Sequence, residues 1–186
     1  MNFLIISGNP KNIGLCHEIT IAACSGAAAG GADCQIEYTN DIQRCKMCGD
    51  GWGICKNENK CTFGVDDGFD NLHNKIKKAD AICFITPVYW WDVSEGLKSF
   101  LDKLRRCEFG QEGALSGKPV LLIASPGGSG NGLINCFEQM ELFCRHTGAN
   151  VFDFIGVNRW NKDYKSICVF EAAKALACGR KVGDDV

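Results

Sequence analysis

Residues 81–91 read Ala-Ile-Cys-Phe-Ile-Thr-Pro-Val-Tyr-Trp-Trp, and this stretch decides the fold. The segment Ala81–Thr86 is an apolar run, which is typical of a strand that is buried on both faces of a parallel sheet. Pro87 follows the run, and three aromatic residues then stand side by side. The stretch therefore predicts a buried strand whose carboxyl end leads into an aromatic turn.

Similar segments extend outward from this strand in both directions. Further buried strands are expected at 2–7 and 119–125, and half-polar strands at 34–38 and 151–157. Segments with helical spacing lie between them, at about 15–30, 93–104, 133–148 and 166–178. Alternation of this kind implies an α/β fold with helices on both faces of a parallel sheet. Three buried strands flanked by two half-polar ones match a doubly wound, three-layer, five-stranded sheet in the order 2-1-3-4-5.

Composition excludes several classes of protein. The 186 residues carry a formal net charge of -2 and show no basic stripe, so a nucleic-acid partner is not expected. The longest apolar runs are far shorter than the roughly 20 residues needed to span a membrane. The first residues lack the pattern of a signal peptide, which predicts a cytoplasmic protein. Without repeats or linkers, residues 1–186 are expected to form one domain with a cysteine-rich insertion at about 41–66.

Ligands of doubly wound sheets bind beyond the carboxyl ends of the strands, and three loops there have unusual composition. The first, residues 7–16, joins a strand to a helix N-terminus, where free amides and the helix dipole favour an anion. Lys11 and the side chains of Ser7, Asn9 and Asn12 could add donors. This loop has neither the Walker nor the dinucleotide-binding glycine pattern. A phosphate site and an ordinary connecting turn are both open interpretations of this loop alone.

The second and third loops favour a planar ligand. Three adjacent aromatic rings at 89–91 cannot all enter the core, and planar rings at a sheet edge suit stacking on a planar molecule. The alternative is that they pack under a helix or against another copy of the chain. The glycine-rich residues 125–132 let the backbone approach a ligand closely. All three loops are expected to share one edge of the sheet.

These loops together resemble the NAD(P)H-dependent FMN reductase branch of the flavodoxin-like superfamily. The most specific likeness is Pro87-Val88-Tyr89-Trp90 followed by Leu97-Lys98, Phe100, Asp102 and Arg105. The resemblance implies that FMN binds at the rim, with the flavin pyrimidine edge at Gly127–Gly128. The residues that it places around FMN are Ser7, Asn9, Lys11, Asn12, Gly14, Leu15, Cys16, Pro87, Val88, Tyr89, Trp90, Trp91, Ser125, Pro126, Gly127 and Gly128.

The first loop departs from the pattern of that family. Leu15 and Cys16 stand where the family has asparagine and threonine, and Asn9 replaces a serine. Each lost hydrogen bond to a charged group is worth about 1.5–3 kcal/mol. We therefore expect FMN to bind more loosely than in relatives and to be able to act as a substrate.

Four of the thirteen cysteines lie within seventeen residues, as C-x2-C-x6-C-x5-C at Cys45, Cys48, Cys55 and Cys61. Four thiolates around one site suit Zn²⁺ or an iron–sulfur cluster. The segment resembles the compact motif of iron–sulfur flavoproteins, which has two residues where this chain has six, Gly49–Ile54. A [4Fe-4S] cluster, a zinc ion, free thiols and a redox disulfide all stay open.

The resulting hypothesis is an FMN-dependent oxidoreductase that takes hydride from NAD(P)H and passes electrons to a small-molecule or protein acceptor. The flavin carries the chemistry, so no catalytic side chain is expected. The three histidines lie outside the rim loops. The alternative is an iron–sulfur flavoprotein that carries electrons without using NAD(P)H directly. A phospho-receiver is disfavoured because the first and third strands do not end in aspartate. By resemblance, a homodimer or homotetramer is expected.

Overall fold

The computed structural model describes residues 1–46, 48–108 and 113–180, and these form a five-stranded sheet between two layers of helices. The strands are β1 (Asn2–Ser7), β2 (Asp33–Tyr38), β3 (Ala81–Pro87), β4 (Pro119–Ser125) and β5 (Asn150–Gly156). The helices are α1 (Leu15–Ala29), α2 (Cys55–Glu58), α3 (Phe69–Lys78), α4 (Glu95–Cys107), α5 (Leu133–Thr147) and α6 (Lys162–Ala177). None of the helices in these described ranges combines the length and apolar character needed to cross a membrane.

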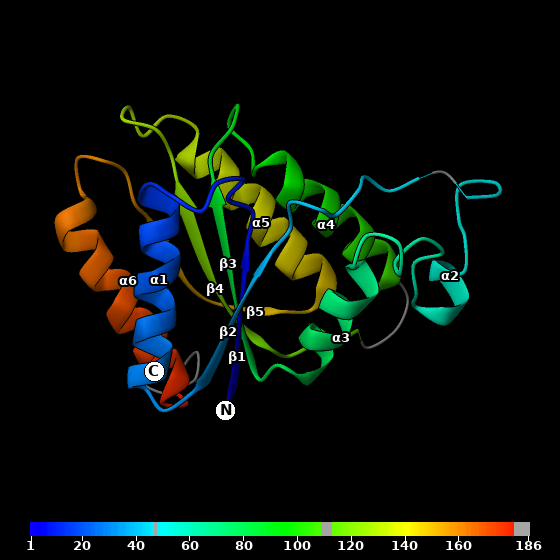
Figure 1. Ribbon diagram of the computed structural model, residues 1–186, viewed down its shortest axis with the longest axis horizontal. Helices are drawn as coiled ribbons and strands as arrows, with labels where there is room; N and C mark the ends of the chain where they lie inside the picture. Colours follow the sequence, from blue (N-terminus) through cyan, green and yellow to red (C-terminus); the bar gives the residue numbers. More distant parts are fainter. Residues whose placement is uncertain (47, 109–112, 181–186) are drawn as a thin grey trace.

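All four pairings in the sheet are parallel, and the strand order is β2-β1-β3-β4-β5. The predicted order 2-1-3-4-5 is therefore confirmed. The chain reverses its direction of winding between β1 and β3, where Ser7 is in register with Ile85. In a doubly wound sheet this reversal opens a crevice beyond the carboxyl ends of the strands. Figure 1 shows the connections that leave those ends gathered along one edge of the molecule.

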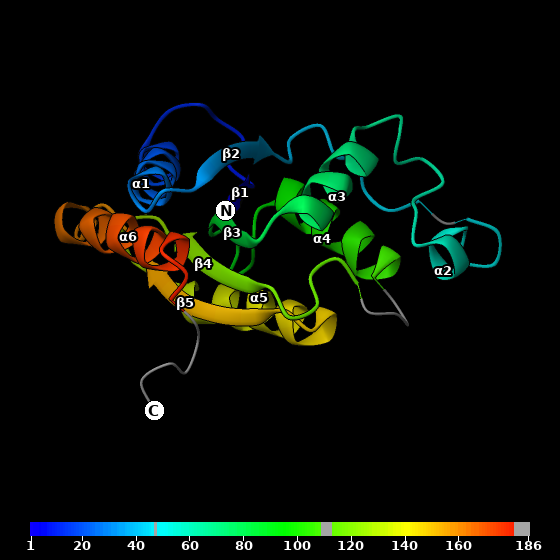
Figure 2. The same cartoon turned by 90° about the horizontal axis from the view of Figure 1, so that it is seen from below.

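Two apolar cores hold the layers together, one on each face of the sheet. Helices α1 and α6 cover one face, and α3, α4 and α5 cover the other (Figure 2). Alternate residues of β3 point to opposite cores: Cys83 and Ile85 face α1 and α6, whereas Ile82 and Phe84 face the other helices. Both faces are buried, which explains why this strand is an uninterrupted apolar run.

Most boundaries agree with the sequence within a few residues, and two local features differ. Asp92 and Glu95 have the spacing of a capping box before α4. Ser94 is the N-cap instead, because its hydroxyl accepts a hydrogen bond from the Leu97 amide at 3.3 Å. The Asp92 carboxylate accepts from the amide of Val93 at 2.7 Å. The cysteine-rich insertion, which lacks helical periodicity in the sequence, contains the four-residue helix α2.

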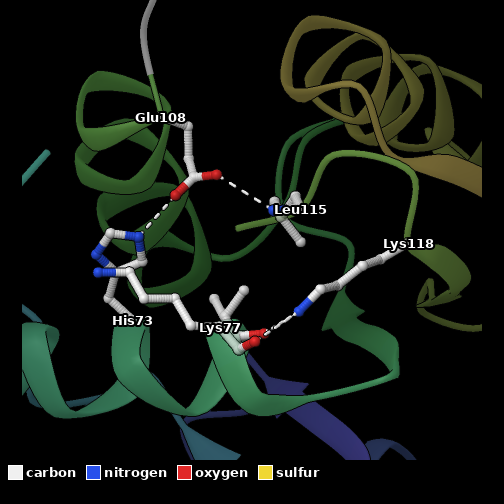
Figure 3. A network of polar contacts seen from close by, with 6 residues as sticks. His73, Lys77, Glu108, Leu115 and Lys118 are labelled. Atoms are coloured by element: carbon white, nitrogen blue, oxygen red, sulfur yellow. Dashed lines mark hydrogen bonds and ion pairs between the residues drawn. The ribbon is translucent and has the colours of Figure 1, made fainter. Parts of the chain in front are cut away.

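A buried polar network joins α3 to the end of α4 (Figure 3). His73 Nε2 lies 2.6 Å from Glu108 Oε1, and the two side chains are 3% and 2% exposed. The other carboxylate oxygen of Glu108 accepts a hydrogen bond from the Leu115 amide at 3.2 Å. Lys118 donates to two carbonyls in the last turn of α3, at 2.6 and 3.0 Å. The network fixes the chain on both sides of residues 109–112 to the same helix.

The α1–α6 contact generates the first prediction. A Cβ atom on Gly26 would lie 2.1 Å from the Phe170 carbonyl oxygen of α6. Glycine-to-alanine changes inside helices ordinarily stabilise by about 1 kcal/mol. Here the clash forces the helices apart, so Gly26→Ala should lower the free energy of unfolding by about 1–3 kcal/mol. Urea denaturation measures this value. Ser25→Ala, at the exposed neighbouring position, is the control and should change it by less than about 0.5 kcal/mol. A stabilised Gly26→Ala protein would contradict the close approach.

Candidate functional site

The loops that follow β1 and β3 are joined at the carboxyl edge of the sheet. Gly8 donates its amide to the Ile85 carbonyl at 2.8 Å, which extends the β1–β3 pairing beyond the last residue of β1. Ser94 then connects the two loops, since its hydroxyl donates to the Gly8 carbonyl at 2.6 Å. The Ser94 amide donates to Thr86 Oγ1 at 2.9 Å. A Cβ on Gly8 would lie 2.4 Å from the Ser94 hydroxyl, so this contact requires glycine.

The predicted phosphate loop, residues 7–16, has buried and exposed donors. Ser7 and Asn9 are buried, and Ser7 Oγ accepts a hydrogen bond from the Asn9 amide at 3.3 Å. The Asn9 side chain also bonds to both backbone groups of Lys11, accepting from the amide and donating to the carbonyl. The side chains of Lys11 and Asn12 are exposed. Asn9 therefore stabilises the turn, whereas the exposed side chains of Lys11 and Asn12 are available to an anion.

The same loop leads into the N-terminus of α1. Gly14 precedes the helix with φ of 85°, a left-handed value that glycine adopts without strain. Among the described residues, no side chain caps this helix, so the amides of its first turn face the edge of the sheet. The Cys16 side chain is buried, and burial raises the pKa of its thiol to about 12. Leu15 also packs against the core, so both residues could offer only backbone amides to a phosphate.

The aromatic stretch forms a tight two-residue turn. The amides and carbonyls of Tyr89 and Asp92 bond reciprocally, at 2.9 and 3.1 Å. Trp90 and Trp91 occupy the two central positions with φ of 50° and 63°. Such a turn favours asparagine and glycine, and other side chains in this conformation cost of order 1–3 kcal/mol each. Trp90 is 89% exposed, and Tyr89 and Trp91 are about half exposed, so none of the three rings belongs to the core.

The glycine-rich loop after β4 is packed between its neighbours. A Cβ on Gly132 would lie 2.7 Å from Trp91 Cα, and one on Gly128 would lie 3.0 Å from Arg159 Nε. Val88 donates its amide to the Ser125 carbonyl at 3.0 Å, which joins this loop to the aromatic turn. Gly127, Gly128 and their neighbours therefore lie on the same edge as the first loop, as predicted. Gly132 is also held at a φ of 79°, so both its conformation and its contact with Trp91 favour glycine.

An open cleft of about 780 Å³ lies beside the aromatic turn. Gly8, Pro10 and Tyr89 line one part of it, and residues 40–44 and the first turn of α4 line the rest. The cleft connects the predicted phosphate loop with the beginning of the cysteine-rich insertion. A ligand there could contact both regions.

The four predicted cysteines line one small cavity of about 20 Å³. Cys107, the last residue of α4, is a fifth thiol in its lining that sequence reasoning did not single out. Its separation of 46 positions from the nearest of the four explains the omission, because no local spacing connects them. Lys103 and Arg106 also line the cavity, from the same helix.

Two basic residues of α4, Lys103 and Arg106, attach the insertion to this helix. Lys103 and Asp67 form a buried ion pair in which each side chain is 2% exposed. The same Asp67 oxygen accepts a hydrogen bond from the Gln43 amide at 2.8 Å, so the pair also holds the start of the insertion. Arg106 donates to the Gly51 carbonyl at 2.7 Å, and its guanidinium lies 4.9 Å from the centre of the Trp52 ring. These contacts place the insertion beside the helix that begins at the rim.

The cysteines are not arranged as a completed metal site. Within residues 1–46, 48–108 and 113–180, no three or more His, Cys, Asp or Glu side chains are placed to hold an ion. Burial raises the pKa of the Cys45 and Cys61 thiols, and raises that of Cys107 to about 12. Burial therefore favours the thiol over the thiolate at these three positions. The chemistry of the donors suits a thiophilic metal, whereas their geometry would have to close around it.

Sequence reasoning missed two residues at the rim. Ser94 lay within the aromatic segment but was not expected to bridge the first loop. Arg159 follows β5 in a loop without a recognisable motif, and only its contact with Gly128 brings it to the site.

An open parallel sheet in this order, with loops of such composition at its carboxyl edge, defines a flavodoxin-like protein. The model of the NADPH-dependent FMN reductase family matches residues 1–159, and the chain belongs to that family. It is 33% identical over 132 residues to an iron-sulfur flavoprotein of Methanosarcina thermophila, an overlap of 68% of this chain and 63% of that one. An iron-sulfur flavoprotein of Methanocaldococcus jannaschii is 31% identical over 112 residues, or 59% and 55% of the two chains.

Solved structures show the same fold. An NAD(P)H:quinone oxidoreductase from Methanothermobacter marburgensis superposes with a TM-score of 0.71 at 18% identity, over 95% of this chain and 96% of that one. The chain spans less than two thirds of the length of each of the two iron-sulfur flavoproteins.

The aromatic turn generates the second prediction. Trp90→Asn should raise the free energy of unfolding by about 0.5–1 kcal/mol, because asparagine tolerates a positive φ better than tryptophan does. Trp90→Ala removes the same ring but keeps the unfavourable conformation, so it should give no such gain. Thermal and urea denaturation of both variants measure the difference. Equal stability of the two variants would show that the backbone at Trp90 is not strained.

Proposed function

We propose that this protein is an FMN-dependent oxidoreductase that takes hydride from NAD(P)H and passes electrons to an acceptor. The observation that carries the proposal is the convergence of the three loops, 7–16, 86–94 and 125–132, at the switch point of the sheet. Membership of the NADPH-dependent FMN reductase family supports the same conclusion.

The residues of the rim suit the two ends of FMN. We propose that its phosphate binds at the N-terminus of α1, where the backbone amides are open and Lys11 and Asn12 are exposed. The isoalloxazine ring would lie between the aromatic turn and Gly127–Gly128, where aromatic faces and close backbone approach are both available. The first loop carries few polar side chains beyond this pair, which favours weak binding of the phosphate.

When bound, the flavin supplies the hydride chemistry, and the protein binds and orients the reactants. The positions of the histidines agree with this division. His17 Nδ1 lies 3.4 Å from the Tyr38 hydroxyl, and His73 is buried against Glu108. His146 lies in the last turn of α5, whose first turn adjoins the rim.

We further propose that the protein acts in the cytoplasm as a homodimer or homotetramer.

Binding of FMN tests the proposal directly. Titration of the purified protein with FMN, followed by flavin fluorescence, should show saturable binding. Tyr89→Ala should raise the dissociation constant by about three- to tenfold, because a stacking contact is worth about 0.5–1.5 kcal/mol. Tyr164→Ala removes another exposed tyrosine, from α6, and should leave the constant unchanged. No saturable binding by the unaltered protein would disprove the proposed function.

A second candidate function is supported by the cysteine cavity. We propose as the alternative an iron–sulfur flavoprotein that carries electrons between partners without using NAD(P)H directly. Four cysteines from a single segment line one cavity, and two relatives are named iron-sulfur flavoproteins. The insertion would then hold the cluster, or a zinc ion, beside the cleft at the rim. Cys45, Cys48, Cys55 and Cys61 are the proposed ligands.

Metal analysis decides between the possibilities for this cavity. Protein purified without oxygen should contain iron and acid-labile sulfide in equal amounts if a cluster is present, or one zinc without sulfide. Cys45→Ser should then release most of the metal, whereas Cys168→Ser, at an exposed position of α6, should not. A folded protein that contains neither metal would leave free thiols or a redox disulfide and would remove the alternative function.

A further inference from the structure

Arg159 brings a positive charge to the glycine-rich part of the rim. Its side chain packs on Gly128, and a Cβ atom there would lie 3.0 Å from Nε and 3.2 Å from Cζ of the guanidinium. The backbone of Gly128 does not have a positive φ, so its close contact is with the Arg159 side chain. The absence of a side chain at Gly128 lets the guanidinium lie directly against the glycine-rich loop.

The loop that carries Arg159 is held by its own hydrogen bonds. Asn158 Oδ1 accepts from the amides of Trp160 and Asn161, at 2.9 and 3.1 Å. Asn161 Oδ1 accepts in return from the Asn158 amide at 2.8 Å. These three bonds enclose residue 159 on both sides. The turn therefore presents its guanidinium to the glycine-rich loop from a fixed backbone.

The charge of Arg159 is not neutralised by a carboxylate in the described part of the chain. The ion pairs found there involve other residues, and Arg145, for comparison, pairs with Glu141 at 2.8 Å on α5. Because no carboxylate pairs with it, the positive charge of Arg159 acts electrostatically on a ligand at the rim. Solvent screens this interaction in part, since the side chain is exposed.

This location matters if the pyrimidine edge of a flavin lies at Gly127–Gly128. Hydride uptake adds two electrons and one proton to the flavin, so the ring gains one negative charge, which is concentrated at the pyrimidine edge. A cation beside that edge favours the reduced form over the oxidised form.

We propose that Arg159 raises the reduction potential of the bound flavin by holding a positive charge beside the Gly127–Gly128 turn. The proposal rests on the proposed binding of FMN at the rim. It assigns to the loop after β5 a function in tuning electron transfer, in addition to the three loops that bind the cofactor.

Three variants test the proposal in protein loaded with FMN. Arg159→Gln removes the charge, Arg159→Lys keeps it, and Arg145→Gln removes an exposed arginine from the far end of α5. The first readout is the midpoint potential of the bound flavin. The second is the dissociation constant of sulfite, which adds to oxidised flavin and leaves a negative charge on the same edge of the ring.

Arg159→Gln should lower the potential and raise the sulfite dissociation constant by about three- to tenfold, with a smaller difference at high salt. Arg159→Lys and Arg145→Gln should stay within about twofold of the unaltered protein. Equal sulfite affinities and potentials for the two glutamine variants would overturn the proposal while leaving FMN binding intact. An Arg159→Lys protein as impaired as Arg159→Gln would also overturn it, because shape and not charge would then matter. Failure of the unaltered protein to bind FMN would instead overturn the proposed function itself.

Discussion

The hydroxyl of Ser94 is the contact on which the arrangement of the rim depends. It caps α4 and at the same time bonds to the Gly8 carbonyl in the loop after β1. The neighbouring strands β1 and β3 carry their crossover helices on opposite faces of the sheet, so their loops diverge at the switch point. Ser94 fastens the two loops where they would separate. The start of α4 and the loop that leads to α1 are thereby held in a fixed relative position.

The loops after β3, β4 and β5 then pack against one another. The aromatic turn comes directly before Ser94, and Trp91 packs on Gly132 of the next loop. That loop in turn packs on Arg159, so the connections after β1, β3, β4 and β5, which are neighbours in the sheet, contact one another along its edge. Helix α4 also carries Lys103 and Arg106 to the cysteine-rich insertion. One helix thus relates the cysteine cavity to the rim.

The sequence predicts the fold well because the strands are apolar runs with few alternatives. Ile82 to Ile85 must be buried on both faces, and burial of that kind leaves only a central parallel strand. The cap of α4 is harder to infer, since Asp92 and Ser94 are both suitable caps and the serine is the one that also bonds to Gly8. Arg159 escaped notice because a single arginine in a loop has no pattern. Its significance comes from a neighbour 31 positions earlier in the chain.

The insertion shows the limit of local reasoning more clearly. Cys45, Cys48, Cys55 and Cys61 were grouped by their spacing, and the structure brings them to one cavity. Cys107 and Asp67 act on the same region from outside the motif, through helix packing and a buried ion pair. Contacts of this kind depend on the whole fold and cannot be inferred from the spacing of cysteines.

The distribution of tryptophan gives this protein an unusual optical property. All four tryptophans lie in loops: Trp52 in the cysteine-rich insertion, Trp90 and Trp91 in the aromatic turn, and Trp160 beside Arg159. None is buried in either core. The tryptophan fluorescence of the folded chain therefore originates at the cysteine-rich insertion and the rim. Tryptophan fluorescence therefore reports on the proposed flavin and metal sites, whereas the two apolar cores contribute no tryptophan fluorescence.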